Sequence, residues 1–138
     1  MTDHLTKERR SWNMSRIKSK GTKPELLMKQ ALQQAGYRFT MHNGQLPGKP
    51  DFFIKKHNLI IFVHGCFWHR HKRCKIAYTP KSKKEFWLKK FAENVARDQR
   101  QLRQLRRMGY AVHVFWECQI KNTSKLKQRM QTLKDHFS

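Results

Sequence analysis

Cysteine and histidine residues gather in one short segment of this sequence. Residues 66–74 read Cys-Phe-Trp-His-Arg-His-Lys-Arg-Cys, and one more cysteine follows at position 118. Thiolates and imidazoles in a tetrahedral set are the ligands of a closed structural zinc site. The alternative is that the cysteines are free and buried and the histidines solvated, but the grouping favours a metal. Five candidates compete for the four places: Cys66, His69, His71, Cys74 and Cys118.

Acidic residues are scarce, with 9 Asp and Glu against 31 Lys and Arg, so each acid near a motif is informative. Asp51 follows Pro50 and opens an apolar segment, where a carboxylate could hold Mg²⁺ against a phosphate. The alternative for Asp51 is an ordinary turn aspartate. Asp98 lies within the apolar stripe of a predicted helix, where a charge needs a partner, either an arginine or a catalytic histidine. Glu25 stands three residues after Thr22, a spacing that indicates a helix-capping role.

Histidines and aromatic residues add two further signals. His64 and His69 lie five residues apart, and two histidines beside a metal-bound carboxylate suit proton transfer near neutral pH. The alternatives are zinc ligation for His69 and a solvated strand end for His64. Phe67, Trp68 and Trp87 stand among Lys and Arg, a pattern typical of base stacking or intercalation. Core packing is the favoured alternative for Trp87 alone.

The charge of the chain indicates a polyanionic partner. Its formal net charge is +22, which favours nucleic acid first and an anionic membrane surface second. No apolar run approaches the ~20 residues of a membrane-spanning helix, and the N-terminal residues lack the apolar segment of a secretory signal. We therefore expect an intracellular protein in a reducing compartment, whose cysteines do not form disulfides.

Hydrophobic periodicity and turn residues predict the elements that position these groups. Helices are expected over residues 24–35 and 83–107, with a last helix marked by Leu126, Met130, Leu133 and Phe137. Strands are expected over residues 37–42, 51–56, 59–64 and 110–116, with a hairpin turn at 56–58. Residues 1–21 are interpreted as a basic arm rather than part of the core, and residues 22–138 as a single domain. The order predicts an α/β fold with a mixed sheet of about four strands flanked by helices. The long helix carries an apolar stripe of Leu88, Phe91, Val95, Leu102 and Leu105.

Several motifs fall in an order that resembles the very short patch repair (Vsr) DNA mismatch endonucleases. The resemblance covers residues 9–118 and is most specific at the run His64-Gly-Cys-Phe-Trp-His-Arg-His71. It implies a restriction-endonuclease-like core of the PD-(D/E)XK superfamily. It also implies a Mg²⁺-dependent nick beside the thymine of a T:G mismatch, which arises when 5-methylcytosine deaminates. The other motifs are Asn13-Met-Ser-Arg-Ile17, Thr22-Lys-Pro-Glu25, Leu46-Pro-Gly-Lys-Pro-Asp51, Asn94-Val-Ala-Arg-Asp98 and Trp116-Glu-Cys118.

The resemblance also implies roles for individual residues. Asp51 would bind Mg²⁺ together with the backbone carbonyl of Val63, and Glu25 would support this site through water. His69 would be the general base, His64 its helper, and Asp98 would orient the catalytic histidine. The zinc ligands would be Cys66, His71, Cys74 and Cys118. Phe67, Trp68 and Trp87 would enter the DNA from one groove, and Met14 of the arm would enter from the other.

One departure from the superfamily concerns the strand that usually carries (D/E)XK. This chain reads Phe62-Val63-His64 there, so the acid and the lysine are absent, and backbone, water and phosphate oxygens must complete a magnesium shell. We expect a monomeric enzyme that acts on double-stranded DNA with a T:G mismatch, in the cytoplasm at the nucleoid, with mismatch-repair proteins as candidate partners. Two alternatives are a non-catalytic zinc-bearing nucleic-acid-binding module and a related endonuclease with another substrate.

Overall fold

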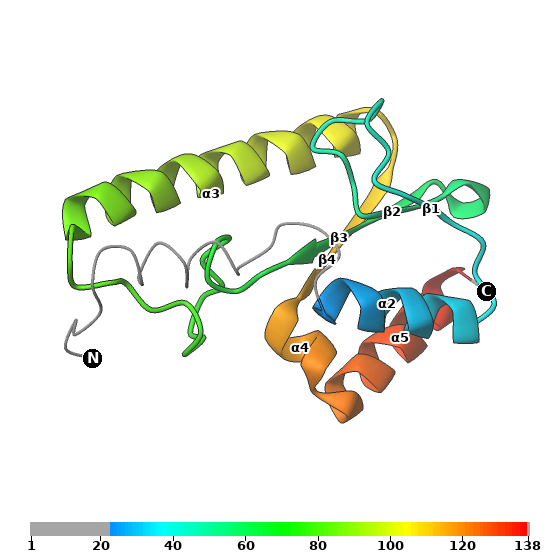
Figure 1. The fold of residues 1–138 in the computed structure, drawn as a ribbon. Coiled ribbons are helices and arrows are strands. Elements are labelled where there is room, and N and C mark those ends of the chain that lie inside the picture. Colours follow the sequence, from blue (N-terminus) through cyan, green and yellow to red (C-terminus); the bar gives the residue numbers. More distant parts are fainter. Residues whose placement is uncertain (1–22, 138) are drawn as a thin grey trace.

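The structure is a computed structural model that describes residues 23–137 (Figure 1). The predicted arm over residues 1–21, including Met14, lies outside the described residues. The described elements, in chain order, are α2 (Lys23–Gln34), β1 (Thr40–Met41), β2 (Phe52–Ile54), the 3-10 turn η1 (Lys55–His57), β3 (Leu59–His64), α3 (Lys84–Arg107), β4 (Ala111–Trp116), α4 (Glu117–Lys121) and α5 (Thr123–Phe137).

The strands form one mixed sheet in the order β1-β2-β3-β4. The pairs β1–β2 and β2–β3 are antiparallel, whereas β3 and β4 are parallel and the chain between them passes through α3. The mixed four-stranded sheet expected from the sequence is therefore confirmed. In the parallel pair His64 lies opposite Trp116, so the segments that follow β3 and β4 leave the sheet side by side.

Helices cover both faces of the sheet, with α3 on one face and α2 and α5 on the other (Figure 1). Alternate residues of β3 point to opposite faces, since successive side chains of a strand alternate. Leu59 and Ile61 join the core with the α2 and α5 side chains, while Ile60 and Phe62 pack with Leu105 of α3. This double burial explains why β3 reads as a continuous apolar run.

The bounds of the predicted elements agree closely with the structure, with four differences. The strand expected over residues 51–56 is confined to Phe52–Ile54, because Lys55–His57 form the 3-10 turn η1. The strand expected over residues 37–42 is reduced to Thr40–Met41, because the chain leaves α2 through a left-handed Gly36 and pairs with β2 only briefly. The short helix α4 was not predicted. Leu88 was placed in the apolar stripe but is 48% exposed, and it belongs to the first turns of α3, which extend beyond the sheet (Figure 1).

Candidate active site and metal cluster

A cleft of about 400 Å³ opens between α3 and the C-terminal end of β3. The parallel strand β4 ends at the same edge of the sheet. The loop before β2 closes one side: Gly48 has a φ of +77°, and a Cβ there would lie 2.8 Å from the side-chain oxygen of Gln101. Glycine therefore lets this loop approach α3 closely. The cleft is lined by His42, Gly48, Lys49, Asp51, Phe62, Val63, His64, His69, Arg97, Asp98 and Gln101.

The structure brings together the two histidines and the helix aspartate that the sequence singled out. His69 Nδ1 lies 2.6 Å from Asp98 Oδ2, and the ring of His69 stacks on that of His64 with centroids 3.9 Å apart. Burial, followed by the nearby His69, lowers the pKa of His64 to about 3, so this imidazole stays neutral. Burial, the largest single influence, raises the pKa of the Asp98 carboxyl, but the hydrogen bond with His69 and the nearby positive charges, including Arg97, together outweigh it, so the pKa lies below its usual value. Asp98 therefore faces His69 as a carboxylate.

Asp51 sits at the start of β2 and turns its carboxylate toward β3. The backbone N–H of Val63 donates a 2.7 Å hydrogen bond to Asp51 Oδ2. Burial raises the pKa of the Asp51 carboxyl to about 6 in spite of this hydrogen bond, and the neighbouring Glu25 adds to the rise. A carboxyl group in a cleft whose pKa is raised by burial is a candidate for a functional role such as metal binding.

Glu25 and His42 complete this side of the cleft, and the sequence analysis did not single out His42. Glu25 is 2% exposed, and its carboxylate is hydrogen-bonded to His42 Nε2. One ligand atom from each of Glu25, His42 and Asp51 lies within 4.8 Å of the others, a grouping that could hold a metal ion. Thr22, the expected capping partner of Glu25, lies outside the described residues. Periodicity could not reveal His42, because its partners are 17 and 9 residues away.

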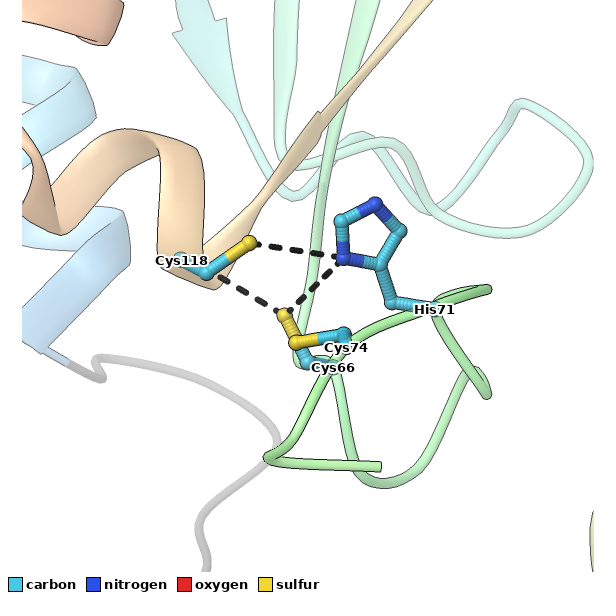
Figure 2. Close-up of side chains that lie close together, drawn as sticks. All are labelled: Cys66, His71, Cys74 and Cys118. Carbon is cyan, nitrogen blue, oxygen red and sulfur yellow. Dashed lines mark hydrogen bonds between the residues drawn. The ribbon is translucent and has the colours of Figure 1, made fainter. Parts of the chain in front are cut away.

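A second cluster consists of Cys66, His71, Cys74 and Cys118, whose ligand atoms all lie within 4.8 Å of one another (Figure 2). His71 Nδ1 is 3.6 Å from Cys66 Sγ and 3.4 Å from Cys118 Sγ. Three thiols and one imidazole in a tight group fit a closed tetrahedral metal site. Of the five candidates, the structure places His69 in the cleft and the other four in this cluster.

The parallel strands explain how residues 52 positions apart meet. Cys66 follows the end of β3 by two residues, and Cys118 follows the end of β4 by two. Because His64 and Trp116 are opposite in the register, the two cysteines leave the sheet at the same edge. There the Cys118 N–H donates to Cys66 Sγ at 3.4 Å, and burial raises the pKa of the Cys66 thiol to about 12.

The loop aromatics pack on the first turns of α3. Phe67 is only 4% exposed and contacts the rings of Trp68, Trp87 and Phe91 at centroid distances of 5.0, 5.9 and 5.3 Å. The core-packing interpretation given to Trp87 alone therefore describes Phe67 as well, while Trp68 and Trp87 are half-buried. Arg70, which the sequence analysis overlooked, holds this loop together. Its guanidinium lies 3.8 Å from the Phe91 ring centroid and donates to the carbonyls of Ala77 and Tyr78.

Comparisons with known proteins agree with this architecture. A family described as DNA mismatch endonuclease Vsr matches residues 2–75. The Type II nicking enzyme V.XorIIP of Xanthomonas oryzae is 42% identical over 135 residues, which cover 98% of each chain. The Type II nicking enzyme V.NmeAIP of Neisseria meningitidis is 39% identical and covers 96% of this chain and 94% of its own. The DNA mismatch endonuclease Vsr of Escherichia coli is 37% identical, over 96% of this chain and 84% of its own. The chain is therefore a DNA endonuclease and belongs to the Vsr family.

Proposed function

We propose that this endonuclease nicks one DNA strand beside the thymine of a T:G mismatch, in a Mg²⁺-dependent step of very short patch repair. The observation that carries the proposal is the pairing of His69 with Asp98 in a cleft that also holds the Asp51 carboxylate. A base oriented by an acid and a carboxylate beside it are the groups that metal-assisted phosphodiester hydrolysis requires.

His69 is assigned the general base. With its Nδ1–H donated to Asp98, the Nε2 lone pair remains available to accept a proton from the attacking water. The Asp98 carboxylate then stabilises the imidazolium that forms. His64 stacks on the same ring and stays neutral, so it adds no second positive charge beside His69 when the proton arrives.

Asp51 and Glu25 fit a hard divalent cation, because carboxylate oxygens are the ligands that Mg²⁺ prefers. When bound, the magnesium ion would polarise the scissile phosphate and stabilise the leaving oxygen. The backbone carbonyl of Val63 is a further proposed ligand. Lys49 and Arg97 line the same cleft, and their charges would attract the DNA phosphates.

The cluster of Cys66, His71, Cys74 and Cys118 is proposed to bind zinc in a structural role. Its donor set is that of closed structural zinc sites. The high pKa of Cys66 means that this thiol gives up its proton only when a metal replaces it. The ion would fasten the loop after β3 to the start of α4, which fixes His69 relative to Asp98.

Trp68 and Trp87, together with Met14, are proposed to recognise the mismatch by stacking or wedging at the opened base step. Phe67 is buried against the rings of both tryptophans and would hold them in position. The protein is expected to act as a monomer.

A second candidate function is nicking at another mismatch or sequence context. The names of the Xanthomonas and Neisseria relatives, which state a nicking activity and no mismatch, favour keeping this candidate.

Single-turnover nicking of matched duplexes tests the proposal. One panel carries a single T:G mismatch in varied flanking sequences, and the control panel carries T:A or C:G at the same position. We expect Mg²⁺-dependent cleavage of one strand of the T:G duplexes only, and none by Asp51→Asn. Equal cleavage of the paired duplexes would establish the second candidate in its place.

A further inference from the structure

The cation site at Asp51 differs from an all-oxygen magnesium site in one respect: an imidazole nitrogen lies within it. Glu25 comes from α2, His42 from the turn after β1, and Asp51 from the start of β2. These three elements bring two carboxylates and the His42 Nε2 atom within 4.8 Å of one another. The set therefore offers one nitrogen and two oxygens to a single ion.

The backbone holds His42 in this position. Its φ is +52°, a left-handed conformation that is uncommon for residues other than glycine, although histidine adopts it more often than most. The His42 N–H also donates to the Asp51 carbonyl at 3.2 Å, so the turn is tied to the residue that carries the carboxylate. The turn conformation and this hydrogen bond together fix the position of His42 relative to Asp51.

We propose that His42 Nε2 is a direct ligand of the catalytic cation and that this ligand makes the site bind Mn²⁺ or Co²⁺ more tightly than Mg²⁺. The inference rests on the proposed function only in placing a catalytic cation at Asp51. Mg²⁺ takes oxygen ligands almost exclusively, whereas first-row transition metals accept imidazole nitrogen. An imidazole nitrogen grouped with two carboxylates thus adds affinity for a transition metal and little for magnesium.

The competing interpretation is that His42 only orients Glu25 through their hydrogen bond. In that case the imidazole would remain on the carboxylate when the cation binds. Replacing His42 by another hydrogen-bonding residue would then leave the order of metal preference unchanged. The two interpretations therefore differ in metal binding itself, which can be measured without DNA or turnover.

The experiment uses the full-length, zinc-loaded protein and follows Mn²⁺ binding by electron paramagnetic resonance, with Mg²⁺ as competitor. Pulsed spectra report whether a ¹⁴N nucleus is coupled to the bound Mn²⁺. The variant is His42→Gln, which keeps a hydrogen-bonding side chain. His57→Gln is the matched control, because His57 lies at the opposite end of β3 from the cleft. Asp51→Asn establishes which signal belongs to this site.

We expect the wild type to show ¹⁴N coupling and to prefer Mn²⁺. His42→Gln should lose the coupling and weaken Mn²⁺ binding by at least about tenfold, the lower end of what even an outer-shell partner contributes, with Mg²⁺ binding little changed. The His57→Gln control should match the wild type. Bound Mn²⁺ without coupling, or coupling and affinity unchanged in His42→Gln, would overturn the inference.

The measurements distinguish failure of the proposed function from failure of the assignment of His42 as a metal ligand. If Mn²⁺ binding depends on Asp51 and His42 but no T:G duplex is nicked with either metal, the ligand assignment stands and the function falls. If Mg²⁺ supports mismatch nicking while His42→Gln leaves Mn²⁺ binding unchanged, the function stands and the ligand assignment falls.

Discussion

His69 and His71 are two residues apart, yet their side chains enter different clusters. Arg70 between them has a φ of +57°, a left-handed conformation at the end of the turn over residues 66–70. The N–H of His69 donates to the Gly65 carbonyl and that of His71 to the Cys66 carbonyl, each at 3.1 Å. The turn thus presents one imidazole to Asp98 and the other to the cysteines.

This divergence predicts opposite phenotypes for the two alanine substitutions. His69→Ala should keep zinc content and melting temperature near those of the wild type and lose most nicking, since loss of a general base costs on the order of 10²–10⁴ in rate. His71→Ala should lose zinc and stability, and activity should fall as a consequence. Zinc analysis, thermal melting and single-turnover nicking of both variants measure this. A His69→Ala protein without zinc would reverse the assignment of the two residues.

The ionised carboxylate of Asp51 is expected to lower the free energy of unfolding of the protein when no metal is bound. Its pKa rises from 3.8 to about 6 on folding, so the folded state holds the proton more tightly than the unfolded state does. The ionised carboxylate therefore destabilises the fold above about pH 6, by at most about 3 kcal/mol. Asp51→Asn removes this charge and retains an oxygen for the Val63 N–H. We expect the variant to melt at a higher temperature than the wild type at pH 7.5 without added Mg²⁺.

The sign of the pH dependence provides the control for this prediction. As pH falls from about 6 toward 4, the wild-type carboxyl becomes protonated in the folded state and its cost disappears. The stability difference between the variant and the wild type should shrink over the same range. A difference that stays constant from pH 4 to 7.5, followed by thermal melting, would show that the buried charge is not its cause.

At the level of the elements, the strongest periodic patterns predicted the fold well. The strand Leu59–His64 and the helix ending at Arg107 have the predicted bounds to within one residue, because one is a continuous apolar run and the other a long amphipathic stretch. The helix α4 has five residues, too few to show a period. Its position depends on β4 ending beside the cysteine cluster, which is a property of the assembled sheet.

Site residues that lie in dense sequence motifs could be predicted. Residues that reach the site only through contacts between distant elements could not. Asp98 could be recognised because an acid in an apolar stripe needs a partner. His42 could not, since its neighbours in sequence, Met41 and Asn43, carry no signal for a partner on α2. The burial of Phe67 was also hidden, because only the fold of the loop against α3 covers that ring.

The loop aromatics are expected to divide into a packing residue and a DNA-facing residue. Phe67 is buried among Trp87 and Phe91, so Phe67→Ala should lower the free energy of unfolding by about 3–5 kcal/mol, as in other large-to-small core changes. Trp68 is half-buried, so Trp68→Ala should cost less stability and reduce the ratio of T:G to T:A cleavage. Denaturant unfolding and competitive nicking of the two duplexes measure the pair. Equal losses of selectivity at equal stability would contradict the division.

For the whole molecule, exposed positive charges and the candidate active-site cleft lie along the same helix, α3. The exposed residues of α3 include Lys89, Arg97, Arg100 and Arg103, and α3 borders the cleft. Between residues that the structure describes, two ion pairs involve Lys or Arg, Arg97–Asp98 and Lys121–Glu117. Most cations in the described part therefore remain available to phosphates. None of the helices over residues 23–137 is long and apolar enough to cross a membrane.

A chain with this charge should bind DNA with a steep dependence on salt. If six to ten phosphates are contacted, affinity should fall by roughly 10³–10⁵ between 50 and 200 mM salt, because each contact releases a condensed counterion. Fluorescence anisotropy of a labelled duplex over a salt series measures the slope of log affinity against log salt.

Arg97→Ala removes a cation at the cleft and should reduce the magnitude of that slope by about one. Lys134→Ala is the matched control: α5 covers the opposite face of the sheet from α3 (Figure 1), so its slope should equal that of the wild type. A reduced slope for Lys134→Ala with none for Arg97→Ala would place the DNA on the other face of the molecule.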